Sequence, residues 1–302
     1  PVVVDNTAPS VSNVSISPSS GVYTGTVLTC SATASDVDDG TLTPTYSWSV
    51  GGVVIGTGAT YTISANDTNV GQQVVCTATA TDSDGGTDSG IDSVSVSNTN
   101  PTISSVSISP NANVTNDLTL TCSASASDID ESVSPTFAWV LNGSQVATGS
   151  SIDLTTHTVS PTDAVACEAT VTDSSGGTVS GNAVVSITNR NPVVTQPVLS
   201  DSSPEAFETI TCSSSASDAD GESVSVSYVW TVSGSVVGNS DTLVLSPTTY
   251  SVGDVVICEV SASDGYGGTD SASVFATVAN THPTITNANI SPSSSLTTSS
   301  LL

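Results

Sequence analysis

Residues 28–48 read LTCSATASDVDDGTLTPTYSW, and residues 74–82 read VVCTATATD. In both stretches apolar or small residues alternate with Ser and Thr, which is typical of a strand with one buried and one exposed face. Cys30, Trp48 and Cys76 fall on the faces expected to be buried. The pattern therefore predicts short β-strands whose inward side chains form a core around these three residues.

This Cys–Trp–Cys pattern repeats along the chain. The step from the first Cys to Trp is 18, 17 and 18 residues (48−30, 139−122, 230−212), and the step from Trp to the second Cys is always 28. Successive first cysteines lie 92 and 90 residues apart (122−30, 212−122). A repeat of this length suits one small β-sandwich. The full set is Cys30–Trp48–Cys76, Cys122–Trp139–Cys167 and Cys212–Trp230–Cys258.

An Asn-x-x-Pro phrase stands before each repeat, at 6–9, 98–101, 189–192 and 280–283. We therefore expect domains at 7–98, 99–189 and 190–280, with 281–302 as the start of a fourth, incomplete repeat. Residues 1–6 match the ends of the first two repeats, and we interpret them as the final strand of a preceding one. On this reading the protein continues in both directions.

The charge of −27 arises from 28 acidic residues and one basic residue, Arg190. Nucleic acids and anionic membranes are bound by neutralising phosphates with Lys and Arg, so neither is expected as a partner. No apolar run is long enough to span a membrane. The two histidines, His157 and His282, do not recur among the complete repeats, so we expect no enzymatic activity.

The Cys, the Trp about 18 residues later and the second Cys resemble the immunoglobulin fold, and the sequence is similar to the immunoglobulin-like and PKD-like repeats of prokaryotic surface or filament proteins. Antibody-type domains are disfavoured, because Val74 and its counterparts replace the Tyr expected two residues before the second Cys. The resemblance implies an all-β tandem array of three immunoglobulin-like sandwiches with partial repeats at both ends. It also implies one inter-sheet disulfide per domain, pairing Cys30 with Cys76, Cys122 with Cys167 and Cys212 with Cys258. Disulfides require an oxidising compartment, so we expect an extracellular or cell-surface protein.

An aspartate follows every cysteine by six residues, and because six is even it shares the inward face of that cysteine at the end of the strand. Facing aspartates without a basic partner either take up a proton or share a cation. Carboxylate and amide oxygens are ligands of calcium, so we predict a calcium cluster at each domain junction. The predicted ligands are Asp36, Asp38, Asp82, Asp84, Asn98, Asn100, Asp128, Asp130, Asp173, Asn189, Asn191, Asp218, Asp220 and Asp264.

The arrangement is partly similar to that of cadherin repeats, in which acidic loops and an Asn-rich linker bind calcium between domains. A second interpretation stays open: Asp near a loop also caps the loop backbone in ordinary turns. Turn chemistry alone does not explain the identical placement of Asp on two strands of each repeat.

These features favour a structural stalk or filament, stiffened by calcium at the domain junctions, whose partners are neighbouring copies or repeats of the same protein. One alternative is an adhesin whose loops bind glycans or other surface proteins, which predicts a distinctive exposed patch on at least one domain. Another is a filament subunit that polymerises by strand exchange through its incomplete terminal repeats.

Overall fold

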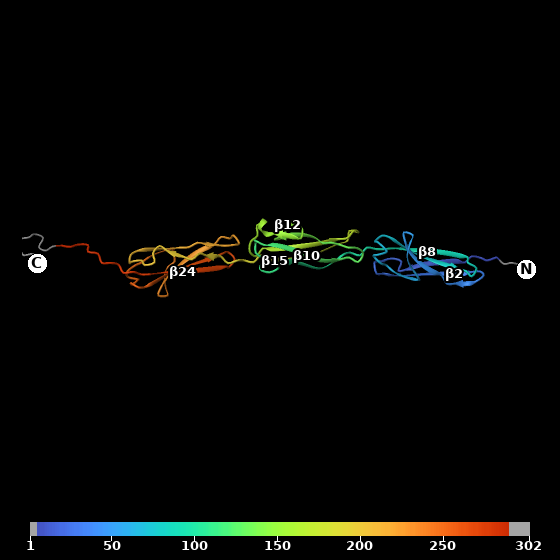
Figure 1. The fold of residues 1–302 in the computed structure, drawn as a ribbon, viewed down its shortest axis with the longest axis horizontal. Coiled ribbons are helices and arrows are strands. Elements are labelled where there is room, and N and C mark those ends of the chain that lie inside the picture. Colours follow the sequence, from blue (N-terminus) through green and yellow to red (C-terminus); the bar gives the residue numbers. More distant parts are fainter. Residues whose placement is uncertain (1–4, 290–302) are drawn as a thin grey trace, which may run out of the picture. The chain divides into compact units, whose positions relative to one another are not determined.

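The computed structural model describes residues 5–289, and the chain divides into two compact units, Pro1–Ile187 and Thr188–Leu302. The first unit contains two β-sandwiches and the second contains one (Figure 1). Most of the predicted preceding strand at 1–6, and much of the predicted fourth repeat, lie outside the described residues.

The first sandwich has two antiparallel sheets that face each other. One sheet contains β1 (Ser10–Ser17), β2 (Val27–Asp36), β3 (Gly40–Leu42) and β6 (Thr60–Thr62). The other, in the order β5-β4-β7-β8, contains β4 (Thr45–Val50), β5 (Val53–Thr57), β7 (Gln73–Thr81) and β8 (Thr87–Ser95).

The second sandwich repeats this plan. Its smaller sheet contains β9 (Thr102–Ser109), β10 (Thr119–Ser127) and β13 (Ser151–Asp153). Its larger sheet contains β11 (Thr136–Leu141), β12 (Ser144–Thr148), β14 (Ala164–Thr172) and β15 (Thr178–Ser186). A short 3-10 helix at Leu154–Thr156 follows β13.

In the third sandwich the smaller sheet is divided. Its pieces are β16 (Val193–Val194), β17 (Val198–Leu199), β18 (Thr209–Ser213), β19 (Ala216–Ser217) and β22 (Thr242–Val244). The larger sheet is intact and contains β20 (Ser225–Val232), β21 (Ser235–Gly238), β23 (Val255–Ser263) and β24 (Thr269–Thr277).

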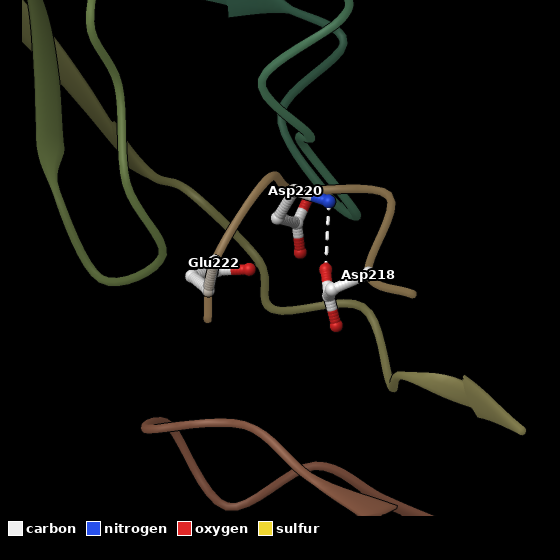
Figure 2. Close-up of side chains that lie close together, drawn as sticks. All are labelled: Asp218, Asp220 and Glu222. Atoms are coloured by element: carbon white, nitrogen blue, oxygen red, sulfur yellow. Dashed lines mark hydrogen bonds between the residues drawn. The ribbon is translucent and has the colours of Figure 1, made fainter. Parts of the chain in front are cut away.

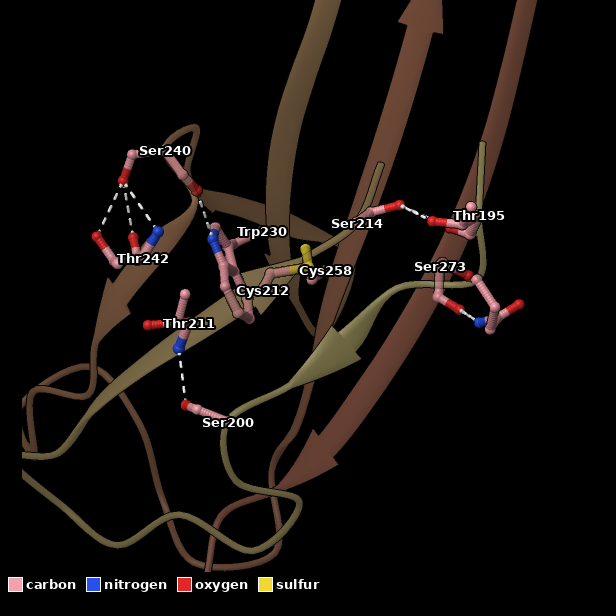
Figure 3. The surroundings of a disulfide bond; sticks show 11 residues. Thr195, Ser200, Thr211, Cys212, Ser214, Trp230, Ser240, Thr242, Cys258 and Ser273 are labelled. Carbon is pink, nitrogen blue, oxygen red and sulfur yellow. Dashed lines mark hydrogen bonds between the residues drawn. A yellow bond between two sulfur atoms is a disulfide. The ribbon is translucent and has the colours of Figure 1, made fainter. Parts of the chain in front are cut away.

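Each sandwich is joined internally by one disulfide, as the resemblance predicted. The bonds Cys30–Cys76, Cys122–Cys167 and Cys212–Cys258 connect the two facing sheets of each sandwich, with Cα–Cα distances of 6.5, 6.3 and 6.6 Å. The tryptophan beside each bond is 0% exposed. Its indole N–H is satisfied by a backbone carbonyl, as Figure 3 shows for Trp230 and Ser240 at 2.8 Å. The fold class is therefore confirmed: three immunoglobulin-like sandwiches, each with its own covalently bridged core.

Three separate cores fill these sandwiches, and each draws its buried residues from a single Cys–Trp–Cys repeat. The outward faces carry hydroxyl side chains instead, and these pair across neighbouring strands. The Oγ atoms of Ser15 and Ser31 are 3.0 Å apart in the first domain, and those of Ser107 and Ser123 are 2.9 Å apart in the second. Such cross-strand pairs stabilise a sheet modestly and account for the high Ser and Thr content. The exact domain boundaries at 98, 189 and 280 stay predictions.

Candidate functional site: the acidic ends of the domains

Asp36, Asp82 and Asp173 are buried at the ends of their strands, as the strand period predicts, whereas Asp128, Asp218 and Asp264 are half-buried. Asp36 ends β2 and is 8% exposed, while Asp82 and Asp173 follow β7 and β14 and are each 7% exposed. The carboxylate oxygens therefore have little contact with water, and their partners within the protein decide their chemistry.

The aspartates that follow the second cysteine, which we call the clamp aspartates (Asp82, Asp173 and Asp264), bind their own loop with one oxygen. Oδ1 of Asp173 accepts the backbone N–H groups of Ser175 and Gly177 at 2.9 and 2.7 Å. Asp82 and Asp264 accept the matching pairs at 2.7–3.0 Å. This is the turn chemistry that the sequence left open.

The other oxygen of each clamp aspartate binds the linker that enters the domain. Asn98 Nδ2 donates to Asp173 Oδ2 at 2.9 Å. Asn6 and Asn189 donate to the other two clamp aspartates at 3.0 and 2.9 Å. These amide hydrogen bonds are the main reason why the pKa of each clamp aspartate is lowered, with burial opposing them and the loop N–H groups adding to them.

The linker is also held at its next residue. The backbone N–H of Thr99 donates to Asp130 Oδ2 at 2.6 Å, and that of Thr7 donates to Asp38 at 2.9 Å. In the third domain Arg190 occupies this position and its N–H donates to Asp220 at 2.6 Å. We call the two consecutive contacts, through Asn and through the following N–H, the linker clamp.

The aspartates that follow the first cysteine differ from the clamp aspartates in having one oxygen without a partner. Oδ1 of Asp36, Asp128 and Asp218 accepts the N–H two residues later, at 2.7 Å in each domain. Oδ2 of all three is buried and has no hydrogen-bond partner. A buried carboxylate oxygen without a donor is unfavourable, so a cation, a proton or a water molecule at this place would stabilise each domain.

The third domain adds another carboxylate to this position (Figure 2). Single oxygens of Asp218, Asp220 and Glu222, on the loop between β19 and β20, lie within 4.8 Å of one another. Both carboxylate oxygens of Glu222 are buried without a partner. Burial, followed by the contact with Asp218, raises the pKa of Glu222.

In the first two domains the third acidic residue of this loop points elsewhere. Asp39 accepts the backbone N–H of Ser83 at 2.7 Å, and Glu131 accepts that of Ser174 at 2.5 Å. These bonds connect the two loops of one domain end. Gly221 stands at the equivalent position in the third domain, so the acid is shifted by one residue and joins Asp218 instead.

The remaining predicted ligands are arranged less uniformly. The side-chain oxygens of Asn100 and Asp173 both face Gly177, and those of Asn191 and Asp264 both face Gly268. Ala8 stands at the corresponding place in the first linker. Asp84 is exposed and lines an open hollow of about 430 Å³ together with Asp5, Asn6 and Asp38.

Within the first unit, the acidic end of the second domain also receives groups from the first. Thr24 Oγ1 donates to Asp130 Oδ1 at 2.5 Å. Asn69 and Val70 line a hollow of about 370 Å³ with Asp130, Glu131, Ser174 and Ser175. Carboxylate residues of the second domain and an amide residue of the first therefore lie around one hollow, and carboxylate and amide oxygens are ligand types that calcium takes.

Comparison with solved structures gives distant matches to multidomain β-proteins. Three N-terminal domains of the Hoc capsid protein of bacteriophage RB49 match at 13% identity and TM-score 0.29, covering 91% of this chain and 100% of that one. A Ca²⁺-stabilised ice-binding adhesin of an Antarctic bacterium matches at 16% identity and TM-score 0.35, covering 92% of this chain and 75% of that one. Domains EC1–4 of Drosophila N-cadherin match at 15% identity and TM-score 0.31, covering 93% of this chain and 76% of that one.

No protein-family model and no curated protein matches the sequence. The structural matches are too distant to transfer a function, so the site has to be interpreted from its own geometry. The disulfides place the chain among secreted or cell-surface proteins. Between residues 5 and 289, no helix has the length and apolar character of a membrane span.

Two residues of this site were not among the predicted ligands. Asn6 was recognised only as part of a boundary phrase, although it is the first linker's donor to Asp82. Glu222 was not among the predicted ligands, although it completes the acidic group of the third domain. The repeated Asn in the boundary phrase was a usable signal for the first. The second depends on a one-residue shift within a loop, which sequence periodicity does not reveal.

Proposed function

We propose that this chain is a segment of an extracellular stalk or filament, and that its acidic domain ends fix each linker to the domain that follows. The linker clamp is the observation that carries this proposal. In each domain, two consecutive linker residues are bound by two different acidic loops. A linker held at two points loses most of its freedom to swing about the domain end.

Proline strengthens this restraint. Pro9, Pro101 and Pro192 follow the clamp residues and are buried. Proline fixes its own φ and restrains the preceding residue to extended geometry. A chain whose linkers are held in this way suits a mechanical or spacing role better than one that requires domains to reorient.

We further propose that the ion at these ends is calcium. The partnerless Oδ2 atoms of Asp36, Asp128 and Asp218 supply one buried carboxylate oxygen in each domain. Asp38 in the first domain and Glu222 in the third would add further carboxylate oxygens. The clamp aspartates Asp82, Asp173 and Asp264 are less suited, because both of their oxygens already accept hydrogen bonds, and the same holds for Asp130 and Asp220. The ion would supply positive charge to these acidic loops, because the whole sequence contains one Lys or Arg residue, Arg190.

Calorimetric titration of the full chain with calcium, with magnesium as the comparison ion, tests this assignment. We expect saturable calcium binding that Asp36→Asn and Asp128→Asn each reduce by one site. The exposed Asp153→Asn serves as a control with no expected effect on binding. Absence of calcium binding at millimolar concentration would remove the ion from the proposal while leaving the linker clamp in place.

Small-angle scattering of the full chain tests the stalk role itself. We expect Asn98→Ala combined with Asn189→Ala to shorten the mean end-to-end distance, because two linkers lose their side-chain contact. Asn182→Ala, on the exposed face of β15, is the matched control. Identical scattering from the double variant and the control would contradict a role for the clamp in extending the chain.

An adhesive role is the second candidate, and one observation favours it. On the outer face of the third domain, Phe275 is 65% exposed beside its strand partner Ile257 at 39%, with Val236 at 66% in the same row. The matching pair in the first domain is Ser93 and Val75. Exposed apolar clusters of this kind often mark binding surfaces. Loss of binding to immobilised glycans or host surface proteins in Phe275→Ser, with Ser93→Ala as control, would support this candidate.

A further inference from the structure

We infer that Arg190 is a built-in counter-ion that holds the linker of the third domain without a divalent ion, whereas the first two domains depend on one. This inference rests on the proposed function, because it assigns different ion requirements to the clamps of that function. Arg190 and the residues that it contacts belong to the second unit of the chain, and the residues compared with them belong to the first.

The geometry of Arg190 goes beyond the single backbone contact of its counterparts. Its N–H donates to Asp220 Oδ2 at 2.6 Å, its Nε donates to Asp220 Oδ1 at 2.8 Å, and its Nη2 donates to the carbonyl of Ala219 at 2.8 Å. The Asp220 side chain is 0% exposed and that of Arg190 is 29% exposed. Charged, forked contacts with a buried carboxylate are stronger and more directional than a neutral N–H alone.

The corresponding linker residues are Thr7 and Thr99, which offer the loop a backbone N–H and no positive charge. Asp38 and Asp130 therefore lie near Asp36 and Asp128 without any cationic side chain, since Arg190 is the single basic residue of the sequence. Repulsion between these carboxylates works against the loop shape that binds the linker. An external cation has to offset that repulsion in the first two domains.

In the third domain, different carboxylates bind the linker and remain available to a cation. Arg190 neutralises Asp220, which is the carboxylate that binds the linker. Asp218 Oδ2 and both oxygens of Glu222 keep no hydrogen-bond partner, so this pair remains open to a cation. Removal of that cation changes the Asp218–Glu222 pair but leaves the contacts of Arg190 in place.

Hydrogen exchange at single amides of the full chain, measured by NMR with calcium and with EDTA, tests the inference. We expect the N–H of residue 99 to be protected in calcium and to exchange about ten-fold faster in EDTA, the factor that corresponds to roughly one charged hydrogen bond. The N–H of Arg190 should be protected equally in both buffers. Equal sensitivity of both amides to EDTA would overturn the inference.

Two reciprocal substitutions sharpen the test. Arg190→Thr should make the N–H of residue 190 sensitive to EDTA, and Thr99→Arg should make that of residue 99 insensitive. Thr99→Arg is independent of any loss of folding in Arg190→Thr, and Thr99→Gln is its uncharged control. If the N–H of residue 99 exchanges as fast in EDTA in Thr99→Arg as in Thr99→Gln, the inference is wrong. If EDTA does not change the exchange of residue 99, the first two domains do not depend on a divalent ion and the inference is wrong, even if Thr99→Arg raises protection there. Calcium binding itself, the separate claim of the proposed function, is decided by the calorimetric titration.

Discussion

The two oxygens of each carboxylate at these domain ends have different partners. In Asp173, Oδ1 holds the loop that follows its strand and Oδ2 holds the preceding linker. In Asp128, Oδ1 does the same for its own loop and Oδ2 has no partner. Turn formation and ion binding, which were competing interpretations of the sequence, are thus compatible because they involve different atoms of the same side chain.

Removal of one clamp amide should destabilise the domain that it contacts. Asn98→Ala leaves Asp173 Oδ2 buried without its donor, and we expect the melting temperature of the second domain to fall by about 5 °C, the scale of one charged hydrogen bond in a domain of this size. Differential scanning calorimetry of the full chain would measure the shift. An unchanged melting temperature, equal to that of Asn182→Ala, would show that the amide contributes nothing.

Two glycines of one loop offer a matched steric pair. A Cβ added at Gly268 would collide with the Asp264 carboxylate and lie 2.9 Å from Asn189 Nδ2, whereas one added at Gly265 meets nothing within 4 Å. We expect Gly268→Ala to destabilise the third domain by about 1–3 kcal/mol and Gly265→Ala to have little effect. Urea unfolding of both variants measures the difference, and equal midpoints would refute the clamp geometry.

At the level of strands, the period-two pattern predicted the long elements well. Two of the strands that carry a second cysteine, β7 and β14, bury every second residue over their whole length. Very short strands such as β3 and β16 were not predicted, because two or three residues carry no periodicity. Parity placed the aspartates correctly, but the sequence does not tell which oxygen binds the linker or that Gly221 shifts Glu222 towards Asp218.

The disulfide should act on one sandwich only, since each core is separate. Replacing both Cys122 and Cys167 by Ala opens a loop with a sequence separation of 45 residues. We expect a loss of about 4 kcal/mol in the free energy of unfolding of the second domain. Calorimetry should show one transition shifted and those of the other domains retained. A shift of all transitions together would contradict independent cores.

At the scale of the whole molecule, acid should act in two opposite directions. The lowered pKa of the clamp aspartates means that their stabilisation is present above the ordinary Asp pKa of 3.8 and is lost as the pH falls through the lowered values. The raised pKa of Glu222 has the opposite effect on stability. Its ionisation destabilises the folded state, so stability is gained as the pH falls through a value above 4.5.

Melting temperatures of the full chain and of Glu222→Gln, measured in EDTA from pH 7 to pH 2.5, separate these effects. The wild-type third domain should gain stability as the pH falls from 7 and then lose it below 3.8, whereas Glu222→Gln should show only the loss. A wild-type profile that coincides with that of Glu222→Gln would mean that Glu222 keeps its ordinary titration.

The position of the linker clamp has a consequence for how such a chain can be lengthened or cut. The Asn-x-x-Pro phrases at 6–9, 98–101 and 189–192 are each bonded to the domain that follows, so a cassette that keeps this bond begins at Asn98 or Asn189. A duplicated gene segment cut in this frame brings its own attachment with it. A recombinant fragment that starts at Thr102 leaves the Asp173 carboxylate without its linker amide, so expression trials should place their first residue upstream of the asparagine.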